Sequence, residues 1–192
     1  MSTVLIVPGL RDHVEAHWQT LLAARLGARG SQVRCVPPMG RGDLDCATRV
    51  AAIEREAQAV EGPLILVAHS GGCVMVAHWA RQTKRAVHGA LLAVPPDFDR
   101  PMPEGYPTVE ELRASGWLPV PPRKQPFPSI VAASRNDPLG ESARVAELAA
   151  GWGSRLVDLG EVGHLNPASG FGPWPRAEQL IAEVAALGAA AG

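Results

Sequence analysis

The sequence predicts one α/β domain in which a parallel sheet lies between two layers of helices. Short apolar runs alternate with longer segments of helical periodicity along the whole chain. Most of the apolar runs carry little polar interruption, which is typical of strands buried on both faces of a parallel sheet. The chain has 192 residues, of which 46% are apolar, so it can bury one sizeable core and is short for two.

The sheet is predicted to contain six strands, at residues 4–7, 32–36, 64–68, 90–94, 130–133 and 156–159. Helices are predicted at residues 14–26, 45–60, 73–82, 142–151 and 177–187, with Asp45 as the N-cap of the second. Strand–helix alternation favours right-handed crossovers between parallel strands. We therefore expect an all-parallel sheet with strand order 2-1-3-4-5-6, in which the order reverses beside the third strand.

A proline-rich segment at residues 95–128 interrupts this alternation. We interpret it as an ordered loop over one edge of the sheet, with a short helix near residues 108–114 that Thr108 caps. The strands on both sides of the segment are needed for one sheet, so no domain boundary is expected within it. The domain is predicted to span residues 1–187, and the alanine-rich end at 188–192 is predicted to be frayed.

Charge and cysteine content exclude several classes of protein. The formal net charge is -1, so no basic excess points to nucleic acid or to an anionic membrane surface. No apolar stretch reaches the length of a membrane span, and the first residues lack a signal-peptide pattern, so a cytoplasmic protein is expected. The spacings of Cys35, Cys46 and Cys73 match no zinc pattern, and we expect these thiols to be reduced and buried.

A serine follows the third predicted strand within the sequence Ala-His-Ser-Gly-Gly, where Ser70 is the third residue. This resembles the nucleophile elbow G-x-S-x-G, in which a strained turn between strand and helix exposes the serine oxygen. Ala68 replaces the first glycine and is small enough for the turn. The amide of Gly71 would lie at the helix N-terminus and could donate to an oxyanion. The alternatives are that Ser70 only caps the helix or lies in an anion-binding turn.

Two further residues occupy the order that such an elbow requires, serine then acid then histidine. Asp137 follows the fifth predicted strand and His164 follows the sixth, so both lie at the carboxyl ends of strands, where active-site crevices form. The alternatives are an ordinary Asn-Asp-Pro turn and a surface histidine. The backbone N–H of Leu10, in the Pro8-Gly9-Leu10 turn after the first strand, is predicted to complete the oxyanion hole.

These segments resemble the YdeN-type serine hydrolases, the family of the retinoblastoma-binding-protein hydrolases. The resemblance covers nearly the whole chain, and it implies an α/β-hydrolase fold without a substantial cap domain. It also implies a Ser70–Asp137–His164 triad, hydrolysis of small esters or amino-acid derivatives, and no metal or organic cofactor. The matching segments are Val7-Pro8-Gly9 with His17-Trp18, Ala68 to Gly72, Ser134 to Pro138, Trp152-Gly153-Ser154, Gly163 to Asn166, Ser169 to Gly172 and Trp174-Pro175.

The expected partner is a small acyl substrate. The Leu-x-Cys-x-Glu sequence of retinoblastoma partners is absent, since Thr48 stands where the glutamate is needed, so that partner is not expected. A non-catalytic binding protein of the same fold, and an acyltransferase or thioesterase using the same triad, are the rival interpretations. Core packing is an equal interpretation for the last two of the residues predicted to line the pocket: His13, Trp18, His69, Asn166, Phe171 and Trp174.

Overall fold

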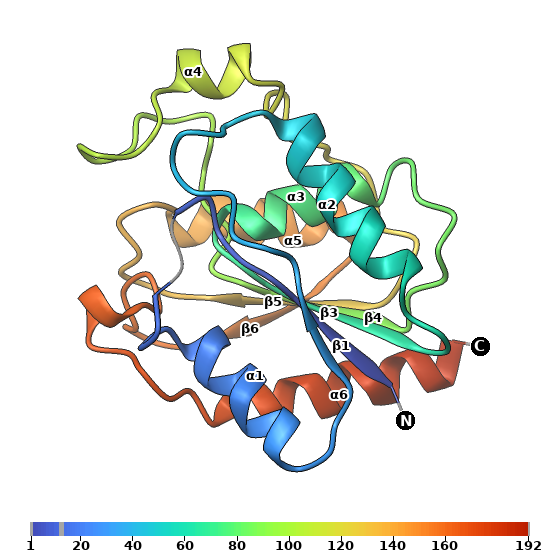
Figure 1. Cartoon of the computed structure of the whole chain (residues 1–192). Coiled ribbons are helices and arrows are strands. Elements are labelled where there is room, and N and C mark those ends of the chain that lie inside the picture. The colour runs from blue at the N-terminus through green and yellow to red at the C-terminus, as the bar shows by residue number, and fades with distance from the viewer. Residues whose placement is uncertain (1, 12–13, 192) are drawn as a thin grey trace.

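The centre of the molecule is a six-stranded, all-parallel sheet in the order β2-β1-β3-β4-β5-β6. The computed structural model describes residues 2–11 and 14–191 (Figure 1). The predicted strand order and direction are both confirmed. The strands are β1 (Thr3–Val7), β2 (Val33–Cys35), β3 (Leu64–His69), β4 (Gly89–Ala93), β5 (Ser129–Ala133) and β6 (Arg155–Asp158).

Helices cover both faces of the sheet and complete a three-layer sandwich (Figure 1). One face carries α1 (Trp18–Ala28) and α6 (Arg176–Ala191), which enclose one apolar cluster against the sheet. The opposite face carries α2 (Cys46–Gln58), α3 (Gly71–Trp79) and α5 (Ser142–Trp152), which enclose the other. Every residue of β1, β3, β4 and β5 is buried, whereas the edge strands β2 and β6 are partly exposed, because each has a neighbouring strand on one side alone.

The proline-rich segment forms an ordered loop that carries α4 (Val109–Ala114) beyond the carboxyl ends of the strands (Figure 1). Thr108 caps α4 as predicted, and it shares a reciprocal capping box with Glu111. The indole N–H of Trp117 donates to the carbonyl oxygen of Leu44 at 2.7 Å, and the Trp117 ring packs edge-on against Phe98. The hydrogen bond fastens the loop to the segment that leads into α2, and the ring contact joins two parts of the loop itself.

The helix ends differ from the prediction by up to four residues, and the largest differences are at the start of α1 and the end of α6. Helix α1 begins at Trp18 and not at residue 14, because the His17 side chain caps it by accepting from the backbone N–H of Gln19. Helix α6 runs on to Ala191, so residues 188–191 form its last turn and not a frayed tail. Alanine has the highest helix propensity, and Gly188 lets this turn approach the His88 carbonyl, with which a β-carbon would collide.

The cysteines are only partly as expected. Cys46 and Cys73 are buried, but Cys35 is exposed because it ends the edge strand β2. A short 3-10 helix, η1 (Pro167–Ser169), lies in the loop after β6. In the part of the chain that the structure describes, no helix is both long and apolar enough to cross a membrane.

Candidate active site

Ser70 lies in a strained turn between the end of β3 at His69 and the start of α3 at Gly71. Its backbone has φ 55° and ψ -132°, a left-handed conformation that a side chain disfavours by about 1–3 kcal/mol. The turn is held on both sides, because the Ser70 N–H donates to the Ala93 carbonyl at 2.9 Å and the Ser70 carbonyl accepts from Cys73 at 2.8 Å. The surrounding sheet therefore maintains a conformation that directs the serine hydroxyl outwards.

The glycine that closes the elbow, Gly72, is required by a close approach between α3 and β1. A β-carbon on Gly72 would lie 2.6 Å from the Pro8 carbonyl oxygen and 2.7 Å from that of Val7. A β-carbon on Gly9 would lie 3.3 Å from the Ser70 β-carbon. The turn after β1 is thus packed directly against the serine.

Three side chains from separate loops form one hydrogen-bonded chain. His164 Nε2 lies 2.7 Å from Ser70 Oγ, and His164 Nδ1 lies 2.9 Å and 3.0 Å from the two carboxylate oxygens of Asp137. The side chains of His164 and Asp137 are 5% and 2% exposed. The structure therefore brings together the serine, histidine and acid that the sequence order predicts, at the carboxyl ends of β3, β6 and β5.

The loop that carries His164 is held by side chains that bond to its backbone. Ser169 Oγ accepts from the His164 N–H at 3.0 Å, and Asn136 Oδ1 accepts from the Gly163 N–H at 2.6 Å. Asn166 caps η1 by accepting from the Ser169 N–H at 3.0 Å. Asn166, predicted as a pocket residue, lines the cleft and also orders this loop.

His69 supports the same loop from beneath. Its Nε2 lies 3.0 Å from the carbonyl oxygen of His164, and because a carbonyl can only accept, this nitrogen must carry a hydrogen. Burial lowers the pKa of His69 well below its usual value, and the neighbouring His164 and His17 lower it further. His69 is therefore a neutral donor that holds the backbone of His164.

Leu10 and Gly71, the two residues predicted to form the oxyanion hole, lie together beside Ser70. Gly71 is the first residue of α3, so its N–H has no acceptor within the helix. The Leu10 side chain packs on Gly71, where a β-carbon would lie 2.6 Å from Leu10 Cγ, and both residues line the cleft. The predicted oxyanion residues are thus adjacent and next to Ser70.

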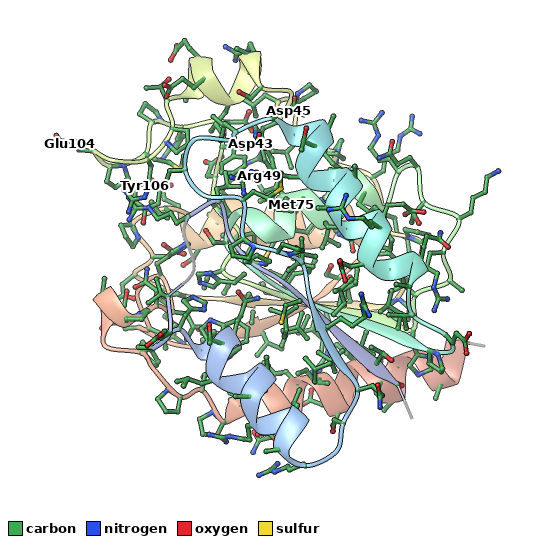
Figure 2. All side chains as sticks on the ribbon, viewed as in Figure 1. Asp43, Asp45, Arg49, Met75, Glu104 and Tyr106 are labelled. Carbon is green, nitrogen blue, oxygen red and sulfur yellow. The ribbon has the colours of Figure 1, made fainter. Side chains whose placement is uncertain are left out.

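Arg49, which sequence reasoning missed, supports the turn that carries Leu10. Its guanidinium is buried and donates to the carbonyl oxygens of Gly40 at 2.6 Å, Asp43 at 2.8 Å and Leu10 at 3.4 Å. Burial lowers the pKa of Arg49 below its usual value. Figure 2 shows Arg49 close to Asp43, near the start of α2. An arginine within a predicted helix is normally interpreted as a solvent-exposed residue, so this role could not be predicted from the sequence.

A cleft of about 820 Å³ opens above Ser70. Of the predicted pocket residues, His69 and Asn166 line it, and His13 lies outside the described residues. Trp18, Phe171 and Trp174 do not line it. Trp18, the first residue of α1, is buried in the apolar cluster between this helix and the sheet, and the half-buried Phe171 and Trp174 pack against that cluster and cover it. The rings of Trp18 and Trp174 lie edge-on with centroids 4.8 Å apart.

Much of the cleft wall comes instead from the 95–128 loop and from the residue after Leu10. The loop contributes Phe98, Met102 and Tyr106, and the turn after β1 contributes Arg11. Phe98, Met102 and Tyr106 were not predicted as cleft residues, because the proline-rich segment has no periodicity from which the direction of a side chain can be inferred. Among the residues that the structure describes, no group of three or more histidine, cysteine or acidic side chains could hold a metal ion.

The chain is similar to known proteins in both sequence and fold. The family described as serine hydrolase matches residues 4–183. A structure described as a YdeN-like hydrolase from Pectobacterium atrosepticum is 28% identical, with a TM-score of 0.79 over 98% of this chain and 91% of that one. No curated protein matches the sequence.

Two more distant structures share the fold. The ydeN gene product of B. subtilis is 19% identical, with a TM-score of 0.74 over 96% of this chain and 98% of that one. Est1E from Butyrivibrio proteoclasticus, with ferulic acid bound, is 13% identical, with a TM-score of 0.71 over 96% and 87% of the two chains. At 19% and 13% identity, these two structures show a shared fold and no more.

Proposed function

Because this chain belongs to the serine hydrolase family and is a hydrolase, we propose that it cleaves small acyl substrates with Ser70 as nucleophile, His164 as base and Asp137 as the orienting acid. The membership confirms the family resemblance of the sequence. The observation that carries the proposal is the unbroken chain of contacts from Ser70 Oγ through the His164 ring to the Asp137 carboxylate.

In the proposed reaction, Ser70 Oγ attacks the acyl carbon while His164 Nε2 takes its proton. Asp137 holds the Nδ1–H tautomer and stabilises the imidazolium. The N–H groups of Leu10 and Gly71 receive the oxyanion, and each such donor contributes about 3–4 kcal/mol in comparable sites. His164 then protonates the leaving group, and water repeats the sequence on the acyl-enzyme.

The character of the cleft supports an acyl substrate with an apolar body. The apolar residues that line it include Val36, Pro38, Phe98, Met102 and Leu139. Apolar side chains of this kind remove water from a bound substrate, which strengthens the hydrogen bonds made at the reacting atoms. Carboxylic esters and aminoacyl esters or amides are the substrate class proposed.

The test is labelling with a fluorophosphonate probe, followed by turnover of p-nitrophenyl esters of rising acyl length. We expect wild type to label and turn over, and Ser70→Ala to lose both. Ser31→Ala, a serine outside the cleft, is the matched control and should keep both. A folded wild type that does not label would favour the non-catalytic binding protein, and faster turnover of thioesters than of oxygen esters would favour the thioesterase.

We further propose a cytoplasmic location. The support is chemical: Cys46 and Cys73 are buried thiols without a disulfide, and such thiols are typical of reducing compartments. Fractionation of cells that express the chain would test this, and recovery in an oxidising compartment would contradict it.

A further inference from the structure

One wall of the cleft carries a positive charge that the proposed triad does not use. Arg11 directly follows Leu10 in the turn after β1, and its half-buried side chain lines the same cleft as Ser70. Its guanidinium carbon lies 4.1 Å from the centroid of the Tyr106 ring, and its Nη2 donates to the Gly105 carbonyl at 2.8 Å. The guanidinium is therefore held in one plane by the loop that covers the cleft.

The donors of Arg11 are not all used by the protein. The buried Nε has no acceptor among the described residues, and a buried donor without an acceptor is rare in native proteins. Among the described residues, Nη2 is the one nitrogen of this side chain with a hydrogen-bond acceptor, and no carboxylate pairs with the guanidinium. Folding thus leaves Arg11 fixed in position and short of hydrogen-bond acceptors.

Arg41 and Glu111 are the other charged side chains on the described cleft wall, and they carry opposite charges. The Glu111 carboxylate accepts from the Thr108 N–H at 2.7 Å within the capping box of α4 and does not pair with Arg11. The rest of the wall is mainly apolar, so a charge there is screened less than on an open surface. An anion that enters this cleft would find donors and a favourable potential.

We propose that Arg11 binds a carboxylate of the substrate, so that the preferred substrates are acyl compounds with an apolar body and a free carboxylate away from the scissile bond. This inference rests on the proposed function and deepens it. A guanidinium matches a carboxylate with two parallel hydrogen bonds, and stacking on Tyr106 fixes its plane before binding. The carboxylate belongs either to the acyl part or to the leaving group.

Matched pairs of esters separate these two arrangements. The first pair is 4-nitrophenyl hydrogen adipate against its methyl ester, which places the carboxylate on the acyl side. The second is the butyryl ester of 4-hydroxybenzoate against that of methyl 4-hydroxybenzoate, which places it on the leaving group. We expect wild type to prefer the acid in one pair by at least tenfold in kcat/KM, and to lose that preference as ionic strength rises.

The variants test whether Arg11 carries the preference. In Arg11→Gln the acid-to-neutral ratio of kcat/KM should fall at least tenfold. Tyr106→Phe keeps a ring under the guanidinium and should keep the ratio, whereas Tyr106→Leu should lower it. Arg113→Gln removes an exposed arginine of α4 that does not line the cleft, and it should leave kcat/KM unchanged for both esters. If Arg11 only held the loop in place, Arg11→Gln would lower kcat/KM equally for both esters and leave the acid-to-neutral ratio unchanged.

Either of two results overturns the inference: wild type that prefers the acid in neither pair, or an unchanged acid-to-neutral ratio in Arg11→Gln. A binding measurement keeps the test independent of turnover. Ser70→Ala titrated with monoethyl adipate and with diethyl adipate should bind the monoacid more tightly, and Arg11→Gln added to this variant should abolish the difference. A binding preference in a protein that hydrolyses nothing would retain the Arg11 site and overturn the proposed function, while equal binding would overturn the site.

Discussion

Replacing Gly72 by alanine tests how closely the elbow is packed against the first strand. The added β-carbon would lie 2.6 Å from the Pro8 carbonyl oxygen and 2.7 Å from that of Val7. Both distances are below any normal carbon–oxygen contact, and both oxygens belong to backbone, so either α3 or the turn after β1 must move. The substitution therefore tests the fold and the proposed oxyanion hole together.

The magnitude follows from two opposing effects. Overpacking of this kind costs about 1–3 kcal/mol. The helix-propensity gain of alanine over glycine, about 1 kcal/mol in helix interiors, applies weakly to Gly72 because it lies in the first turn of α3. We expect a net destabilisation of about 2 kcal/mol, which in a chain of this size lowers Tm by about 4–8 °C.

Activity should fall more than stability suggests. Movement of the turn after β1 carries the Leu10 N–H away from the oxyanion, and a displacement of about 1 Å can cost about a hundredfold in rate. We expect kcat on a p-nitrophenyl ester to fall at least tenfold with a smaller change in KM, since the oxyanion contact forms in the transition state.

A matched glycine serves as the control. A β-carbon on Gly27, in α1, would meet nothing within 4 Å, so Gly27→Ala should raise stability by about 0.5–1 kcal/mol and leave kcat unchanged. Thermal unfolding and ester kinetics on both variants make the comparison. Wild-type stability and kcat in Gly72→Ala would refute the argument that α3 and the turn after β1 pack in contact.

Substitutions at three further positions address the proposed triad and the groups that support it. Asp137→Asn should lower kcat about ten-thousandfold, because an amide no longer favours the required tautomer of His164, and should slow fluorophosphonate labelling in proportion; wild-type labelling would contradict the role of the acid. Arg49→Met should lower kcat about tenfold or more with little change in KM, because the Leu10 carbonyl loses its hydrogen bond to Arg49. Arg49→Lys should recover part of the lost kcat. Equal losses of kcat in both variants would indicate a folding defect alone. His69→Gln should make the free energy of unfolding less sensitive to acid. The folded-state pKa of His69 is lowered, so the wild type loses stability as pH falls below the unfolded-state pKa of about 6.5. The expected loss in wild type is about 1.4 kcal/mol between pH 7.5 and 5.5. Urea unfolding at the two pH values measures this difference, and an identical loss in wild type and His69→Gln would show that His69 is not held neutral.

The parts of the fold that the sequence predicted are those in which local pattern and global packing agree. Buried strands such as β3 appear as uninterrupted apolar runs, and the order serine, acid, histidine follows the chain, so strand order and the placement of Ser70, Asp137 and His164 could both be predicted. The start of α1 could not, since the capping atom is a histidine nitrogen at His17, and histidine is not among the favoured N-cap residues.

Pocket residues were harder because a loop side chain has no periodicity. Trp174 and Phe171 follow His164 closely in sequence, yet the chain turns at η1 and Gly170 and carries both towards the core beneath α1. Tyr106 is distant from every triad residue in sequence, yet it lies at the cleft, because the 95–128 loop folds back over the strand ends. Figure 2 shows Tyr106 on the loop that leads into α4. Contacts of this kind depend on tertiary structure alone.

The supports of the proposed site share one chemistry, which explains why sequence motifs do not reveal them. Arg49 and His69 both donate from buried side chains to backbone carbonyl oxygens, those of Leu10 and His164. A carbonyl is present at every residue, so the acceptor leaves no mark in the sequence, and the donor is recognised only by its burial. Each bond fixes a loop whose proposed function is to present one polar group to the cleft, the Leu10 N–H or the His164 ring. The rigidity of the proposed catalytic groups therefore derives from the buried donors behind them. Substitutions of Arg49 and His69 should lower kcat by more than they change KM.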